Sequence, residues 1–126
     1  MSGSSSARRI LVVEDDAAIR EAIAEVLSDV GYEVVLAPDG MTGLRIAAEL
    51  SEPCPVLLDW RMPVLDGPAF LEGLRKLPRG FEFAVILATA DRSPAVDSAG
   101  HEVAGVLSKP FDLDELLRVL ERLSRS

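Results

Sequence analysis

The chain has 126 residues, a formal net charge of −8 and a single cysteine. This is the length of one domain; the negative charge argues against nucleic-acid binding by this domain, and one cysteine excludes an internal disulfide. No apolar run approaches the roughly 20 residues needed to span a bilayer, so we expect a cytoplasmic domain without a membrane segment.

Short apolar runs alternate along the chain with segments of helical periodicity. Residues 1–8 resemble a flexible tail, which leaves 9–126 as the domain. The apolar runs predict strands at 10–13, 33–37, 55–59, 83–89 and 105–108. The apolar spacing predicts helices over about 19–30, 41–50 and 67–77, and a last helix capped by Asp112 and Glu115. Gly31 stands where the C-terminal cap of the first helix belongs.

The segment between residues 90 and 104 has the weakest pattern. It contains Pro94 and Gly100, which leave room for only a short or irregular helix. Five apolar strands alternating with helices predict an α/β fold, a doubly wound parallel five-stranded sheet with helices on both faces. In such sheets ligands bind at the carboxyl ends of the strands, near a switch in strand order.

Polar residues stand at the carboxyl end of four predicted strands, so they should meet at one edge of the sheet. These residues are Glu14, Asp15, Asp16, Asp59, Thr89, Ser108 and Lys109. Crowded carboxylates raise one another's pKa unless a cation neutralises them, and Mg²⁺ suits such a set of oxygens. With Lys109 as a second positive charge, the edge predicts a site that receives a phosphoryl group on a carboxylate.

Four stretches, "ILVVEDD", "PVLLDWRMPVLDG", "VILATA" and "SKPF", resemble the signature motifs of the bacterial response-regulator receiver domain. The resemblance runs from about Arg9 to Leu123 and implies a flavodoxin-like sheet of order 2-1-3-4-5. It implies that Asp59 accepts the phosphoryl group from a sensor histidine kinase or phosphotransfer protein. Further roles that it implies are Mg²⁺ ligation by Glu14, Asp15, Asp59 and the Arg61 carbonyl, contacts from Thr89 and Lys109 to the phosphoryl group, and a cis Lys109–Pro110 bond.

The chain departs from the receiver pattern at the switch. The family usually carries an aromatic residue three positions before the lysine, where this chain has Val106, so only Thr89 of the usual switch pair is present. The stretch from Thr89 to Lys109 also looks shorter than usual. The resemblance allows a weak homodimer through the face built by the 90–104 segment, the fifth strand and the last helix.

Three further residues flank the predicted site. Arg61 and Asp91 each follow a site residue by two positions, and we hypothesise that they pair across the mouth and slow loss of the phosphoryl group. Trp60 is expected to be a partly exposed wedge beside Asp59.

Three functions compete. The first is a phosphoacceptor that assists its own phosphorylation and dephosphorylation and switches a downstream protein or output domain. The second is a metal-dependent phosphatase, which would need an acid where Arg61 stands. The third is a pseudo-receiver that only binds protein, as the Val106 switch would allow. The sequence identifies neither the kinase, the stimulus, the output nor the oligomeric state, and it leaves open whether the chain is a stand-alone regulator.

Overall fold

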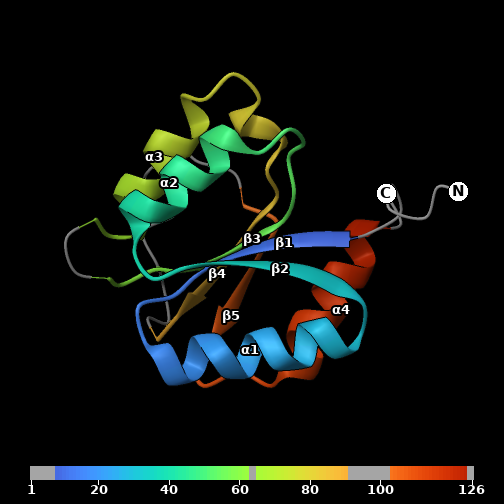
Figure 1. Cartoon of the computed structure of the whole chain (residues 1–126). Helices are drawn as coiled ribbons and strands as arrows, with labels where there is room; N and C mark the ends of the chain where they lie inside the picture. Colours follow the sequence, from blue (N-terminus) through green and yellow to red (C-terminus); the bar gives the residue numbers. More distant parts are fainter. Residues whose placement is uncertain (1–7, 63–64, 91–102, 125–126) are drawn as a thin grey trace, which may run out of the picture.

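The computed structural model describes residues 8–62, 65–90 and 103–124. Five parallel strands form one sheet in the order β2-β1-β3-β4-β5 (Figure 1). They are β1 (Arg8–Val13), β2 (Tyr32–Ala37), β3 (Val56–Asp59), β4 (Val85–Thr89) and β5 (Gly105–Ser108). The predicted flavodoxin-like sheet and its strand order are therefore confirmed.

Four α-helices lie within the described residues: α1 (Ala17–Asp29), α2 (Gly40–Glu49), α3 (Gly67–Arg75) and α4 (Leu113–Ser124). A 3₁₀ turn, η2 (Gly80–Glu82), precedes β4. The short or irregular helix predicted between the fourth and fifth strands falls mostly at 91–102, outside the described residues, so that prediction stays open. In the described part of the chain, no helix combines the length and the apolar character needed to cross a membrane.

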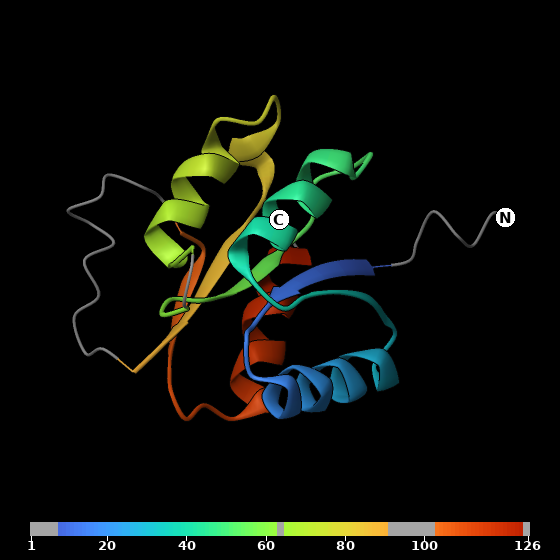
Figure 2. The ribbon, with the colours of Figure 1, turned by 60° about the vertical axis from the view of Figure 1, so that its left-hand side comes forward.

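The helices cover both faces of the sheet. Helices α2 and α3 lie on one face, and α1 and α4 on the other (Figures 1 and 2). Alternate residues of β1 serve the two sides, since Leu11 and Val13 pack in the cluster with α2 and α3, whereas Ile10 and Val12 pack with α1 and α4. A central parallel strand is thus buried on both faces, which explains its uninterrupted apolar sequence.

Three helix ends have defined caps, and two of them, at Gly31 and at Asp112 with Glu115, were predicted from the sequence. The Asp16 carboxylate caps α1 by accepting the Ile19 N–H at 3.0 Å. Gly31 follows α1 with φ of 100°, a conformation that favours glycine. At the start of α4 the Asp112 N–H donates to the Glu115 carboxylate at 3.1 Å, one half of a capping box.

The strand predicted at 83–89 begins later, at Val85. The reason is the guanidinium of Arg75, whose Nη1 binds the carbonyls of Gly80 at 2.7 Å and Phe83 at 3.0 Å. These carbonyls belong to the turn that contains η2, which lies outside the sheet. Arg75 is also the last residue of α3, so this helix ends there rather than near residue 77.

Trp60 is buried, so the expectation of a partly exposed wedge was wrong. Its side chain is 5% exposed and belongs to the core cluster under α2 and α3. Its backbone N–H donates to Ala88 O at 2.9 Å, and its carbonyl accepts the Gly67 N–H at 3.0 Å. Trp60 therefore joins β3 to the start of α3, directly beside Asp59.

Gly67 is predicted to tolerate no side chain. A Cβ there would lie 2.5 Å from Cε3 of Trp60 and 2.8 Å from its Cα and O, and backbone cannot yield cheaply. We expect Gly67→Ala to lower the free energy of unfolding by about 2–4 kcal/mol in urea titrations. Gly105→Ala is the matched control because its Cβ would meet only Val119 at 3.4 Å. Equal stability of the two variants would contradict this account.

Candidate functional site

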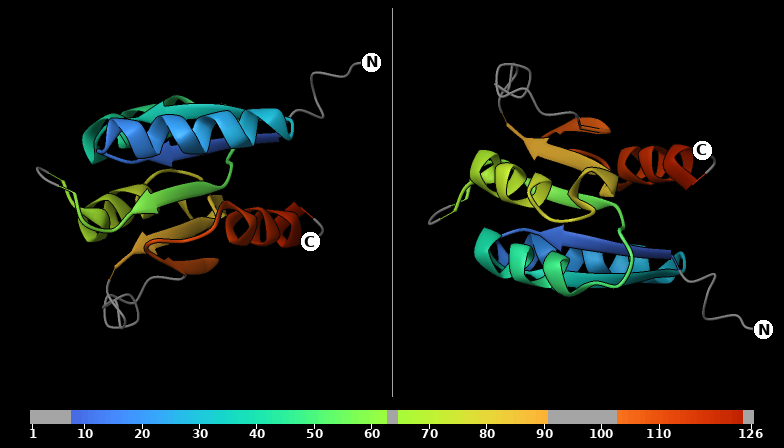
Figure 3. Two further views of the ribbon diagram at one scale, coloured as in Figure 1. Left: turned by 90° about the horizontal axis from the view of Figure 1, so that it is seen from below. Right: turned by 90° about the horizontal axis from the view of Figure 1, so that it is seen from above.

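The carboxyl ends of the strands meet at one edge of the sheet. All strands run in the same direction, so residues that follow them share that edge (Figure 3). Glu14 follows β1, Asp59 and Thr89 end β3 and β4, and Lys109 follows β5. The edge is the one predicted from the sequence.

Three carboxylates converge at this edge. Glu14, Asp15 and Asp59 each offer an oxygen atom, and the three atoms lie within 4.8 Å of one another. Glu14 is 4% exposed and Asp59 5% exposed, whereas Asp15 faces solvent. Two buried acids this close repel each other strongly, because little water screens them.

The Lys109 ammonium lies between the two buried carboxylates. Its Nζ is 3.1 Å from Asp59 Oδ1 and 3.5 Å from Glu14 Oε1. One ammonium against three carboxylates leaves a formal charge of about −2 at the cluster when all three acids are ionised. The peptide bond between Lys109 and Pro110 is cis, as the resemblance implied.

The pKa of Asp59 is raised from 3.8 to about 7, first by burial and then by the charge of Glu14. The hydrogen bond from Lys109 opposes this shift. Burial lowers the pKa of Lys109, but the hydrogen bond and charge of Asp59, aided by Glu14, outweigh burial and raise it above its usual value. The cluster thus holds a firmly charged lysine beside a carboxyl group whose ionisation is costly.

Glu14 accepts hydrogen bonds from two residues that follow it in the chain, one in the loop after β1 and one in α1. Its Oε2 accepts the Asp16 N–H at 3.2 Å, and its carbonyl accepts Nη1 of Arg20 at 2.9 Å. Arg20, one turn into α1, is absent from the residues predicted from the sequence. The sequence signal was its position six residues after Glu14, near the start of the predicted helix. A long arginine side chain there can reach back to the loop after β1.

The other residues predicted for the site are Arg61, Thr89, Val106 and Asp91. The Arg61 N–H donates to Asp59 Oδ1 at 3.3 Å, so the loop after β3 contacts the cluster. Thr89 is 1% exposed and its carbonyl accepts the Lys109 N–H at 2.8 Å. Val106 lies on β5 with 45% of its surface exposed. Asp91 lies outside the described residues, so its predicted pairing with Arg61 stays a hypothesis.

The cluster fits a hard divalent cation. Its donors are all carboxylate oxygens within a small radius, two of them buried, and the excess charge of about −2 matches one Mg²⁺. Cys54, the single cysteine, takes no part because it is buried before β3 with its pKa raised to about 11 by desolvation.

The response-regulator receiver domain family matches residues 10–121. The chain therefore belongs to this family, as the four sequence motifs indicated, and it is a signalling domain of the two-component type. In flavodoxin-like sheets, ligands bind at the carboxyl ends of the strands, near the point where the strand order switches.

Curated relatives share this domain at moderate identity. Response regulator MprA of a Mycobacterium species is 40% identical over 124 residues, covering 93% of this chain and 50% of the relative. The DNA-binding dual master transcriptional regulator RpaA of Synechocystis is 34% identical over 122 residues, covering 93% of this chain and 49% of the relative. The chain spans about half the length of these relatives.

Solved structures share the fold closely. The receiver domain of the sensor histidine kinase PA1611 from Pseudomonas aeruginosa superimposes with a TM-score of 0.85 at 31% identity, covering 95% of this chain and 99% of that one. That crystal structure has a magnesium ion coordinated in its active site cleft. The chemotaxis protein CheY4 of Vibrio cholerae gives a TM-score of 0.83 at 30% identity, covering 92% and 98% of the two chains.

Removing the Asp59 charge is predicted to stabilise the metal-free protein. Because folding raises the pKa of Asp59 from 3.8 to about 7, its ionisation costs stability as pH rises through that window. Without divalent cations, Asp59→Asn should therefore unfold at a higher urea concentration than the wild type at pH 8. Its free energy of unfolding should be higher by about 1–3 kcal/mol at pH 8 and by a smaller amount at pH 5.

Asp16→Asn is the matched control, since it removes an exposed charge two residues from Glu14 and keeps a capping side chain. A less stable Asp59→Asn at pH 8 would mean that attraction to Lys109 outweighs burial and the repulsion from Glu14.

Proposed function

We propose that this domain accepts a phosphoryl group on Asp59 from a histidine kinase or a phosphotransfer protein, and thereby switches its contacts with other proteins. The observation that carries the proposal is the placement of Asp59. It is a buried carboxylate, 3.1 Å from a lysine and grouped with two further acids. A carboxylate that only closed a turn would gain nothing from such costly neighbours.

In the proposed reaction the chain supplies the acceptor carboxylate and two side chains that contact the transferred group. An oxygen of ionised Asp59 attacks the phosphorus atom of a phosphohistidine, the phosphorus–nitrogen bond breaks, and the imidazole leaves with a proton from solvent. Lys109, already 3.1 Å from Asp59, stays in reach of an oxygen of the transferred group. The hydroxyl of Thr89, on the adjacent strand, donates to another. The phosphoryl group is lost when the oxygen of a water molecule attacks the same phosphorus atom and gives a proton to solvent. The bond from phosphorus to Asp59 then breaks, which releases inorganic phosphate and restores the carboxylate.

Magnesium would be held by the carboxylates of Glu14, Asp15 and Asp59 together with the Arg61 carbonyl, Glu14 acting mainly through water. Bound there, it would neutralise the acids and withdraw charge from the phosphoryl oxygens. The all-oxygen donor set supports this assignment, and the magnesium-bound relative supports it by analogy.

The proposed partners follow from the class of domain. They are a sensor histidine kinase or phosphotransfer protein upstream, and a downstream protein or output domain. We place residues 9–126 in one receiver unit in the cytoplasm, and we expect no direct nucleic-acid binding by this domain because the chain carries a net charge of −8. A weak homodimer through β5, α4 and the segment before them is part of the proposal.

The alternative is a pseudo-receiver that binds protein without phosphorylation. One observation favours it: the switch position on β5 holds Val106, an aliphatic side chain that is 45% exposed, where receivers usually carry an aromatic ring. The intact cluster of Glu14, Asp15, Asp59 and Lys109 favours the phosphoacceptor.

Direct phosphorylation separates the two functions. With Mg²⁺ and acetyl phosphate, the wild-type chain should gain the mass of one phosphoryl group, stable in mild acid and lost in base. Asp59→Asn should gain nothing, whereas Asp16→Asn, which changes an acid outside the cluster, should react like the wild type. Chelation of the metal should abolish the adduct. An unmodified wild-type chain would support the pseudo-receiver.

Arg61 is predicted to prolong the phosphorylated state. Its backbone already contacts Asp59, so its side chain starts at the mouth of the site, where it can obstruct an attacking water. In Arg61→Ala we expect dephosphorylation, followed by intact mass after removal of the donor, to become about 3–10 times faster. Arg45→Ala on α2 is the control for loss of a surface arginine. A rate within error of the wild type would remove Arg61 from the mechanism.

A further inference from the structure

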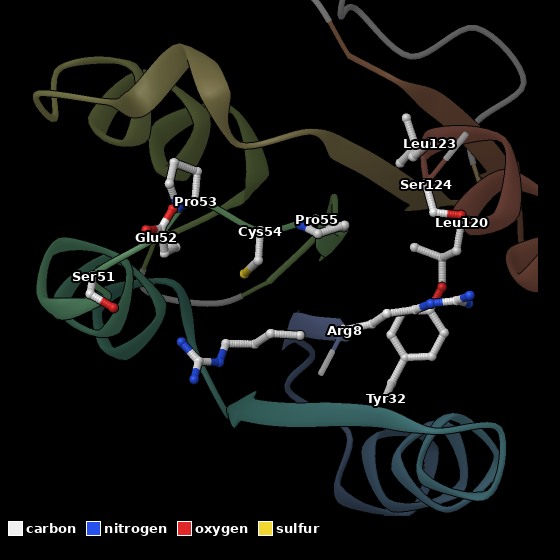
Figure 4. Close-up of a pocket in the computed structure, with 11 residues that line it drawn as sticks. Arg8, Tyr32, Ser51, Glu52, Pro53, Cys54, Pro55, Leu120, Leu123 and Ser124 are labelled. Carbon is white, nitrogen blue, oxygen red and sulfur yellow. The ribbon is translucent and has the colours of Figure 1, made fainter. Parts of the chain in front are cut away.

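An open hollow of about 620 Å³ lies at the edge of the sheet opposite to the carboxylates (Figure 4). Its walls are the starts of β1 and β2, the segment 51–55 before β3, and the end of α4. This volume is in the range of small-molecule sites, and none of the lining residues belongs to the phosphorylation site.

The hollow exists because β1 extends beyond β3. Pairing of the two strands begins at Leu11 opposite Val56, preceded by one hydrogen bond from the Leu11 N–H to Pro55 O at 3.0 Å. Pro53 and Pro55 have no N–H, so neither of these two residues can donate to the start of β1. The sheet therefore opens beside Arg8 and Arg9 instead of closing.

The described residues of the lining combine apolar walls with positive charge. Leu120 and Leu123 of α4 stand opposite the segment that contains Pro53 and Pro55 (Figure 4). Two charged residues of the lining form ion pairs. Arg9 Nη2 lies 3.1 Å from Glu33 Oε1, and Glu52 Oε1 lies 3.7 Å from Arg79 Nη1.

Arg8 differs from these pairs. Its guanidinium carbon lies 5.7 Å from the centroid of the Tyr32 ring, and the described residues give it no acidic partner. A guanidinium held by an aromatic face keeps its donor edge available for a bidentate anion. In a chain with net charge −8, this combination of positive charge and apolar wall is a distinct feature.

We propose that this hollow binds a small ligand that carries one carboxylate or phosphate group on an aliphatic body. The anionic group binds Arg8, and the aliphatic part packs on Leu123, Pro53 and Pro55, which are only partly buried. This site is independent of phosphorylation at Asp59, so its test does not depend on the proposed function.

The test is a titration of the isotope-labelled full chain followed by backbone amide NMR. The probes are octanoate and octyl phosphate, which separate carboxylate from phosphate recognition, with octanol as the neutral control. Both anions, or one of them, should shift amides near Arg8, Tyr32, Cys54 and Leu123 and leave those near Asp59 unchanged. Octanol should bind at least about fivefold more weakly than the preferred anion.

Three variants locate the charge. Arg8→Gln should weaken the preferred anion about fivefold or more, Arg8→Lys should lose less, and Arg45→Gln, an exposed arginine on α2, should match the wild type. Arg8 is exposed at the first position of β1, so the variants should keep the dispersed spectrum of the folded chain.

Four results would overturn the proposal: no shifts at millimolar probe, shifts away from the hollow, equal binding of octanol, or equal losses in Arg8→Gln and Arg45→Gln.

Discussion

Repulsion between Glu14 and Asp59, held in check by Lys109, is the constraint on which the candidate site depends. Both acids are buried at the carboxyl edge because β1 and β3 are central, apolar strands that end at those residues. The ammonium of Lys109 reaches both, at 3.5 and 3.1 Å, from the loop after β5. The sheet thus concentrates charge that folding alone disfavours, a common property of sites that act on charged groups.

The fold and most of the site were predictable because they depend on patterns that are local in sequence. Apolar runs located five strands, and parallel order sends the residues after them to one edge, so Glu14, Asp59, Thr89 and Lys109 could be grouped before any coordinates. The later start of β4 could not be predicted, since it depends on Arg75 reaching the carbonyls of Gly80 and Phe83. The burial of Trp60 was missed because an aromatic residue beside a polar site gives no sequence signal for which side it packs on.

The fold is kept at moderate sequence identity. At 31% identity, the PA1611 receiver domain still superimposes with a TM-score of 0.85. The same fold in this chain carries two features at the opposite ends of its strands: acids where the strands finish, and Arg8 over Tyr32 where β1 begins. The first is the feature that the four sequence motifs indicated, whereas the second arises from the pairing of β1 with β2, which places Arg8 opposite Tyr32.

The two bonds of residue 109 have a mechanical consequence. Its side chain holds Asp59 on β3, while its N–H is bound to Thr89 O on β4 at 2.8 Å. A single residue thus fastens three neighbouring strands together at their tips. Asp59 is thereby linked to the end of β4 through the side chain and the main chain of Lys109 alone. Information leaving Asp59 by that path would need no rotating ring, which is compatible with a valine at position 106.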